Sequence, residues 1–108
     1  MSEHLPVVYQ RFIAEYPQVI GTHHQLTDVL HHAGPLNVGE RRLAKLGIAV
    51  GSESQGAVRS HARKALAEGL SPEAIRQVAV LAISTAGFPV AIAAFGWINE
   101  VLDAESGA

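Results

Sequence analysis

The chain has 108 residues, 48% of them hydrophobic and 17% charged, with a formal net charge of -2. The charged share is below the roughly 25% of an ordinary soluble domain, so we expect copies of the chain to cover part of its apolar surface in an oligomer. The small net charge gives no basic footprint, which argues against nucleic acid and an anionic membrane as partners.

The first two helices are predicted from prolines and apolar spacing. Residues 6–16 read as the first helix, which Pro17 stops or bends. The second helix begins near Thr22, whose hydroxyl can cap it, and ends at Gly34-Pro35.

The third helix has a strong start signal. Asn37 is a good N-cap residue, and Glu40 three positions later completes a variant of the capping box. The helix is predicted to end at Gly51. Its apolar residues are Leu43, Leu46, Ile48 and Val50.

A fourth helix is centred on His61. It ends at Gly69, where a left-handed C-terminal cap needs a residue without a Cβ. Ser71-Pro72-Glu73 then supplies an N-cap hydroxyl, a proline at the first helical position and an early acid, so a fifth helix starts at once. The residues predicted to share one side of the fourth helix are Ser54, Ala57, Val58, His61, Ala65 and Glu68.

The last two helices, predicted over residues 72–85 and 89–102, are apolar almost all the way round. Such helices need cover on both sides, so we expect them to form core and subunit interface, with Phe88, Phe95 and Trp97 supplying most of the large buried area. Residues 103–108 read as a frayed tail. No stretch alternates like a strand. The chain is therefore predicted to be one all-α domain, residues 1–108, with its core over about 17–102.

The first residues lack a basic region followed by an apolar core, so we see no signal peptide and expect a cytoplasmic protein. Residues 78–98 are apolar enough to suggest a membrane span. Gly87 and Pro89, with Ser84 and Thr85 before them, interrupt this stretch, and two buried helices explain it better.

Two further groups of residues carry side chains that could bind a metal ion or react covalently. His24, Asp28 and His32 share one helix face, but the helical rise puts the outer two about 12 Å apart, so they cannot close on one ion. We expect no metal site. Lys45 and Lys64 could form Schiff bases, but neither has a neighbourhood that would lower its pKa, so solvated helix residues are the better interpretation.

Several segments together resemble one family. They are GPLN at residues 34–37, ERRLAKLGIAVG, GAVRSHARKALAEGLSPEAI, a helix ending in TAGFP, and a closing AFGWINEVL. In this order and spacing they resemble the carboxymuconolactone decarboxylase family, which also contains the AhpD-like alkylhydroperoxidases. The resemblance covers roughly residues 17–102. It implies an all-helical bundle of about six helices that assembles as a homotrimer or homohexamer, and no cofactor.

The resemblance also implies site residues. AhpD-like members use a Cys-x-x-Cys-x-x-x-His motif and an upstream glutamate, whereas the decarboxylases use the histidine without a redox pair. The family histidine falls on His61, the cysteine positions on Ser54 and Ala57, and the glutamate on Arg42. The chain has no cysteine. Since a serine hydroxyl does no disulfide exchange, a thiol-dependent peroxidase reaction is chemically unavailable to these residues.

The predicted activity is decarboxylation or isomerisation of a small carboxylated lactone or keto acid. Imidazole titrates near neutral pH, so His61 is the candidate proton carrier that reprotonates the carbanion. Arg42 or Arg59 could hold substrate carboxylates, and Ser54 could bind substrate. A nucleophilic serine is disfavoured, because no aspartate lies within reach along the helix.

The alternatives stay open at this point. His61 could be a partly buried histidine bonded to a carbonyl, Arg42 could be a plain ion-pair residue, and Glu53 could be a proton partner or simply an acid favoured by the helix dipole. The whole chain could then be a catalytically degenerate family member that acts as an oligomeric scaffold or a small-ligand binding module.

Overall fold

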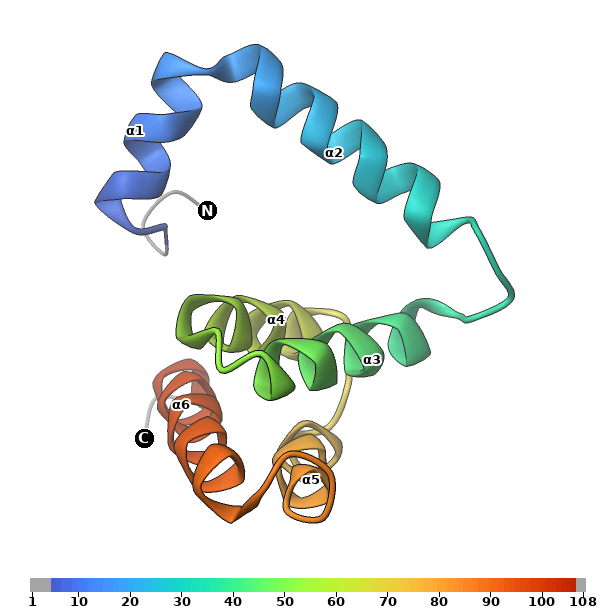
Figure 1. Cartoon of the computed structure of the whole chain (residues 1–108), viewed down its shortest axis with the longest axis vertical. Helices are drawn as coiled ribbons and strands as arrows, with labels where there is room; N and C mark the ends of the chain where they lie inside the picture. Colours follow the sequence, from blue (N-terminus) through green and yellow to red (C-terminus); the bar gives the residue numbers. More distant parts are fainter. Residues whose placement is uncertain (1–4, 107–108) are drawn as a thin grey trace. The chain divides into compact units, whose positions relative to one another are not determined.

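The computed structural model describes residues 5–106, which form six α-helices (Figure 1). No strand occurs within these residues, so the predicted all-α fold is confirmed. The helices are α1 Val7–Glu15, α2 Pro17–His31, α3 Val38–Gly51, α4 Gln55–Ala67, α5 Pro72–Ala82 and α6 Phe88–Ser106.

The chain divides into two compact units, residues 1–35 and 36–108. The first unit holds α1 and α2, and neither helix has a buried residue. The predicted start of α2 at Thr22 is wrong, because the helix begins at Pro17. Proline suits the first helical position, where its missing N–H would have no partner within the helix.

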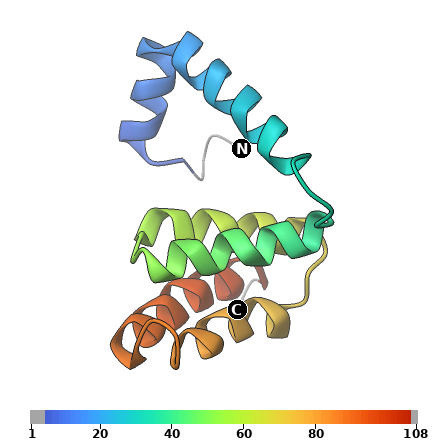
Figure 2. The same cartoon turned by 45° about the vertical axis from the view of Figure 1, so that its right-hand side comes forward.

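The second unit holds α3 to α6 and has a core of its own. Figure 2 shows α3 and α4 side by side above α5 and α6, and contacts also join α3 to α5 and α4 to α6. Aliphatic and small side chains fill the space between the four helices, and Leu46, Ile75 and Ile98 are completely buried. The remaining core residues are Ala49, Val50, Val58, Ala62, Ala65, Ala79, Ala82, Ala91, Ala94, Val101 and Leu102.

The predicted helix ends around α3, α4 and α5 are confirmed. Asn37 and Glu40 form a reciprocal capping box, with both hydrogen bonds 2.9 Å long. Gly69 adopts a φ of 91° after α4, and the Leu70 N–H donates to the carbonyl of Ala65, which closes the left-handed C-terminal cap. The Ser71 hydroxyl accepts from the Ala74 N–H at 3.0 Å and caps α5.

Within a single chain, the large aromatic residues of α6 do not supply most of the buried area, since Phe88 is 59% and Phe95 38% exposed and Trp97 is partly buried against the core. A subunit interface that covers them stays a prediction. The buried residues of α5 and α6 include the alanines Ala79, Ala82, Ala91 and Ala94. The tail is not frayed over its whole length, because α6 continues through Asp103 and Glu105 to Ser106. Gly107 and Ala108 lie outside the described residues.

Candidate functional site: a charged cluster around His61

The helix α4 presents His61 and Glu68 on the same side. They are seven positions apart, which is two helical turns, so their side chains leave the helix in nearly the same direction. Val58, Ala62 and Ala65 are buried on the adjoining side and anchor α4 in the core. The burial of this edge fixes the direction in which His61 and Glu68 project.

Arg42 of α3 meets both of these side chains. Its Nε donates to Glu68 Oε1 at 2.9 Å and its Nη2 to Glu68 Oε2 at 3.0 Å, a two-pronged pair that matches the planar fork of the guanidinium. Its Nη1 lies 2.7 Å from His61 Nδ1. Arg42 is the buried charged residue of the described chain, at 9% exposure. We call Arg42, Lys45, His61, Lys64 and Glu68 the charged cluster.

The contact with Arg42 decides the protonation of His61. A guanidinium can only donate, so Nδ1 must accept and the proton of the neutral ring resides on Nε2. Burial, followed by the positive charges of Arg42, Lys64 and Lys45, lowers the pKa of His61 to about 4, against a partial opposing effect of Glu68. His61 is therefore a neutral imidazole near pH 7, with Nε2–H as its donor.

The two lysines of the cluster differ from the sequence-based expectation. Burial and then the charges of Arg42 and Arg41 lower the pKa of Lys45. Burial and then the charges of Arg42 and Lys45 lower the pKa of Lys64, which Glu68 partly restores. The prediction that neither lysine has a neighbourhood that would lower its pKa is wrong, because burial lowers the pKa of both and because positive charges on the neighbouring helix or one turn away on the same helix add to this effect.

The other predicted site residues lie apart from these contacts. Arg59 donates from Nε and Nη2 to Glu100 Oε2 on α6, at 3.0 and 2.6 Å. Ser54 is the exposed N-cap residue of α4 and makes no capping hydrogen bond through its side chain. Among the contacts within residues 5–106, none joins Ser54 or Arg59 to His61, so their role in substrate binding stays a prediction.

Glu53 does not lie in the first turn of α4. It has a φ of 56° and occupies the left-handed position after α3, where the Ser54 N–H donates to the carbonyl of Ala49. A non-glycine residue in this conformation is uncommon. The predicted explanation of this acid by the dipole of a first helical turn is therefore wrong.

Metal-ligating groups are sparse in the part of the chain that the structure describes. No cluster of three or more histidine, aspartate or glutamate side chains there could hold a metal ion. His32 directs Nδ1 at the carbonyl of Asp28, 2.8 Å away, rather than at His24. Among the described helices, none combines the length and the apolar character needed to cross a membrane.

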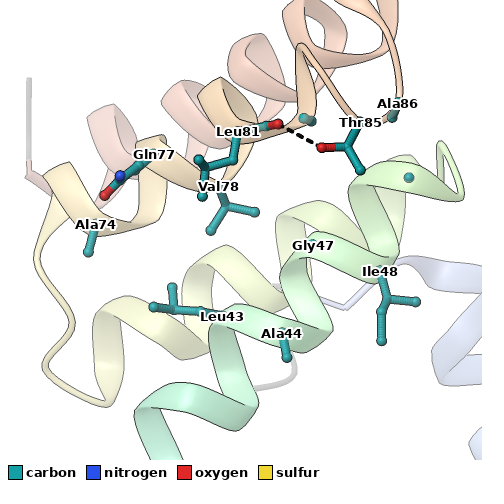
Figure 3. A pocket seen from close by; sticks show the side chains of 12 residues that line it. Leu43, Ala44, Gly47, Ile48, Ala74, Gln77, Val78, Leu81, Thr85 and Ala86 are labelled. Carbon is teal, nitrogen blue, oxygen red and sulfur yellow. Dashed lines mark hydrogen bonds between the residues drawn. The ribbon is translucent and has the colours of Figure 1, made fainter.

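A separate apolar groove of about 550 Å³ lies between α3 and α5 (Figure 3). Its walls include Leu43, Gly47 and Val78, and the hydroxyl of Thr85 at its end donates to the carbonyl of Leu81 at 3.0 Å. The helical spacing places the groove residues of α3 on the opposite side from Arg42 and Lys45. The groove and the charged cluster are therefore distinct features of the second unit.

These observations define a class of protein: an all-helical chain that holds a neutral histidine against a buried arginine, without a cysteine to support thiol chemistry. Comparison with protein families gives a match to the carboxymuconolactone decarboxylase family over residues 22–100. The chain belongs to this family, as a member without the Cys-x-x-Cys motif. Neither the curated proteins nor the solved structures that were compared include a significant match to it.

The family resemblance places a glutamate at position 42 in AhpD-like members, and the arginine found here contacts the histidine directly. The carboxylate of the cluster comes from Glu68 instead, seven residues after His61 on α4. Charge at position 42 is thus reversed, and an acid on another helix pairs with it. The sequence places Glu68 on the His61 side of α4 but contains no signal that pairs it with Arg42.

Proposed function

We propose that the chain is a carboxymuconolactone-decarboxylase-like lyase that acts on a small carboxylated lactone or keto acid, with His61 at the reacting group and no cofactor. The observation that carries this proposal is the contact of Arg42 with His61, which leaves one defined ring nitrogen, Nε2, to act on a ligand. Family membership supports the reaction class.

The chemistry follows from electron movement in an unsaturated lactone. When the carbon–carbon bond to the carboxylate breaks, carbon dioxide leaves and the electron pair moves through the conjugated ring to the lactone carbonyl, whose oxygen becomes an enolate. The Nε2–H of His61 donates a hydrogen bond to this oxygen as its charge develops. One proton from solvent then adds to the ring carbon, and the double bond shifts.

The lowered pKa argues against the predicted role of His61 as a proton carrier and favours a role as a hydrogen-bond donor. A neutral imidazole acts first as a hydrogen-bond donor, and only the small imidazolium fraction releases a proton readily. We therefore expect kcat/KM to be level between pH 6 and 8 and to fall as the pH drops through about 4, the pKa of His61. A rate that instead rises on acidification from pH 7 would assign proton donation to the imidazolium.

The test is turnover of 4-carboxymuconolactone, followed by the loss of its ultraviolet absorbance and by release of carbon dioxide. Purified wild type, His61→Gln and the control His24→Gln are compared at equal oligomeric state. The proposal predicts turnover in wild type and in the control, and a loss of about 100-fold or more in His61→Gln, which removes the aimed donor. Equal rates in His61→Gln and wild type would refute it.

A second candidate is a catalytically degenerate member that serves as a scaffold or small-ligand binding module. The changed residues at positions 42, 54 and 57 favour it, since they remove three of the four AhpD-like positions. This candidate predicts no turnover of carboxylated lactones or keto acids by any variant, while His61→Gln changes stability or ligand binding alone.

The proposal includes a homotrimer or homohexamer. It is supported by exposed apolar side chains on the second unit, among them Ile48 at 68%, Leu81 at 60% and Phe88 at 59%. Light scattering after size-exclusion chromatography measures the mass directly. A monomer across the micromolar range would contradict the oligomer without bearing on the chemistry at His61.

A further inference from the structure

We propose that Lys45 and Lys64, together with the Nε2–H of His61, bind a carboxylate group of the substrate. This inference rests on the proposed function and deepens it, because it assigns the carboxylate to residues other than Arg42 and Arg59.

The guanidinium of Arg42 is already bonded to protein side chains. Three of its five N–H donors are used, two by Glu68 and one by His61. Its side chain is only 10% exposed, so little of the guanidinium can reach a ligand. Arg42 therefore positions His61 and contributes positive charge from behind, while the ligand must find its direct partners elsewhere in the cluster.

Lys45 and Lys64 are placed to be those partners. Lys45 lies three residues after Arg42 on α3, and Lys64 lies three residues after His61 on α4, so both project toward the side that carries the cluster. Lys45 and Lys64 are both less buried than Arg42. Each ammonium group carries three N–H donors on a flexible stem, so it can bind a ligand oxygen in addition to a protein partner.

The balance of charge in the cluster favours an anion. Arg42, Lys45 and Lys64 are cationic, whereas Glu68 is the single acid among the five cluster residues, and its two oxygens accept from Arg42. The three positive groups repel one another in this partly buried site, and the single negative group offsets only part of the repulsion. A bound carboxylate relieves this repulsion and gains charge-assisted hydrogen bonds from the ammonium groups.

His61 supplies the third contact to the ligand, and its pKa reports whether the ligand is bound. Because Nδ1 faces Arg42, Nε2–H on the far edge of the ring is the donor that remains for a ligand. The positive charges of Arg42, Lys64 and Lys45 hold the pKa of His61 down, so an anion bound among them raises that pKa. Ligand binding is thus visible at His61 even when no reaction follows.

The experiment uses the full chain and malonate as the carboxylate probe, with the His61 ring signals followed by NMR and assigned with His61→Gln. Wild type is compared with Lys45→Gln and Lys64→Gln. The matched control is Arg63→Gln, which removes one positive charge on α4 from a position that points away from His61. We expect a saturable shift of the His61 signals at pH 7, an affinity about tenfold lower in each lysine variant, and unchanged affinity in the control.

Three results would overturn the assignment. The first is no shift of His61 up to about 100 mM malonate, a hundredfold excess over a millimolar dissociation constant. The second is an equal affinity in wild type and both lysine variants. The third is tighter binding of inorganic phosphate than of malonate at the same signals, which would assign the site to phosphate esters.

Malonate binding and lactone turnover test the carboxylate site and the lyase activity separately. Malonate binding that depends on both lysines, without turnover of any carboxylated lactone, supports the carboxylate site and refutes the lyase. Turnover with an unchanged KM in Lys45→Gln and Lys64→Gln supports the lyase and refutes the lysine site.

Discussion

Arg42 and Arg59 occupy two contrasting regions of the second unit. Both pair with a glutamate on another segment, yet the side chains of Arg42 and Glu68 are 10% and 28% exposed, whereas those of Arg59 and Glu100 are 29% and 59% exposed. Arg42 also reaches a titratable ring, His61. Among the described contacts, none joins Arg59 to a histidine.

The burial of an arginine and of its partners decides what the arginine does in this structure. In the Arg59 region, solvent screens the pair, so it contributes little to stability. In the Arg42 region, low exposure strengthens each charge effect and makes every missing partner costly. The following predictions test whether this contrast is real, in order of decreasing effect.

The largest effect is expected from Arg42→Gln. The change leaves the Glu68 carboxylate without its two-pronged partner, and breaking a buried pair of this kind costs about 3 kcal/mol of the free energy of unfolding. Urea denaturation measures this loss. Removal of the positive charge also raises the pKa of His61, which NMR titration detects. A loss of unfolding free energy no larger than that of Arg59→Gln would contradict the difference between the Arg42 and Arg59 regions.

Glu68→Gln should have the next largest effect. The neutral amide keeps the shape but gives up charge-assisted hydrogen bonds, at a cost of about 2 kcal/mol. Since Glu68 raises the pKa of His61, its loss should lower that pKa further, opposite to the effect of Arg42→Gln. Equal directions of the two pKa changes would contradict the charge arrangement of the cluster.

Acidification should destabilise wild type relative to His61→Gln. The pKa of His61 is lowered from 6.5 to about 4 in the folded chain, so the unfolded state binds the proton first as the pH falls. The stabilising contribution is complete above pH 6.5 and is lost between 6.5 and 4. After allowance for solvent screening, we expect wild type to lose about 1–2 kcal/mol of its free energy of unfolding relative to His61→Gln, as measured in denaturant titrations. Parallel pH curves for the two proteins would contradict this linkage.

Arg59→Gln should have the smallest effect. An exposed ion pair contributes less than about 1 kcal/mol, so the midpoint of urea denaturation should hardly move. The pKa of His61 should stay unchanged, since Arg59 is not among the charges that shift it. A pKa change as large as that of Arg42→Gln would bring Arg59 into the cluster and revive its predicted role in substrate binding.

Local signals in the sequence predicted much of the fold of the second unit. The capping box of Asn37 and Glu40, the left-handed Gly69 and the Ser71 cap each depend on residues within a few positions of one another, and all three are confirmed. The left-handed conformation of Glu53 could not be predicted in this way, because a left-handed cap usually takes glycine and a glutamate does not indicate one.

Tertiary contacts could not be predicted in the same way. Arg42 and Glu68 are 26 positions apart in sequence and meet only because α3 packs on α4. The lowered pKa of Lys64 and the exposure of Phe88 likewise depend on packing between helices, which periodicity within one helix does not encode. The resemblance to the family pointed to Arg42 and His61, whose side chains lie in contact in the structure.

Burial and the charge of Arg42 keep His61 neutral, and the contact with Arg42 places the ring proton on Nε2. Nitrogen-15 NMR of the imidazole ring from pH 3 to 8 measures both properties, because protonated and lone-pair nitrogens differ widely in chemical shift. The account predicts a lone pair on Nδ1 at pH 7 and a titration midpoint at about 4. A midpoint near 6.5, or a proton on Nδ1, would contradict it.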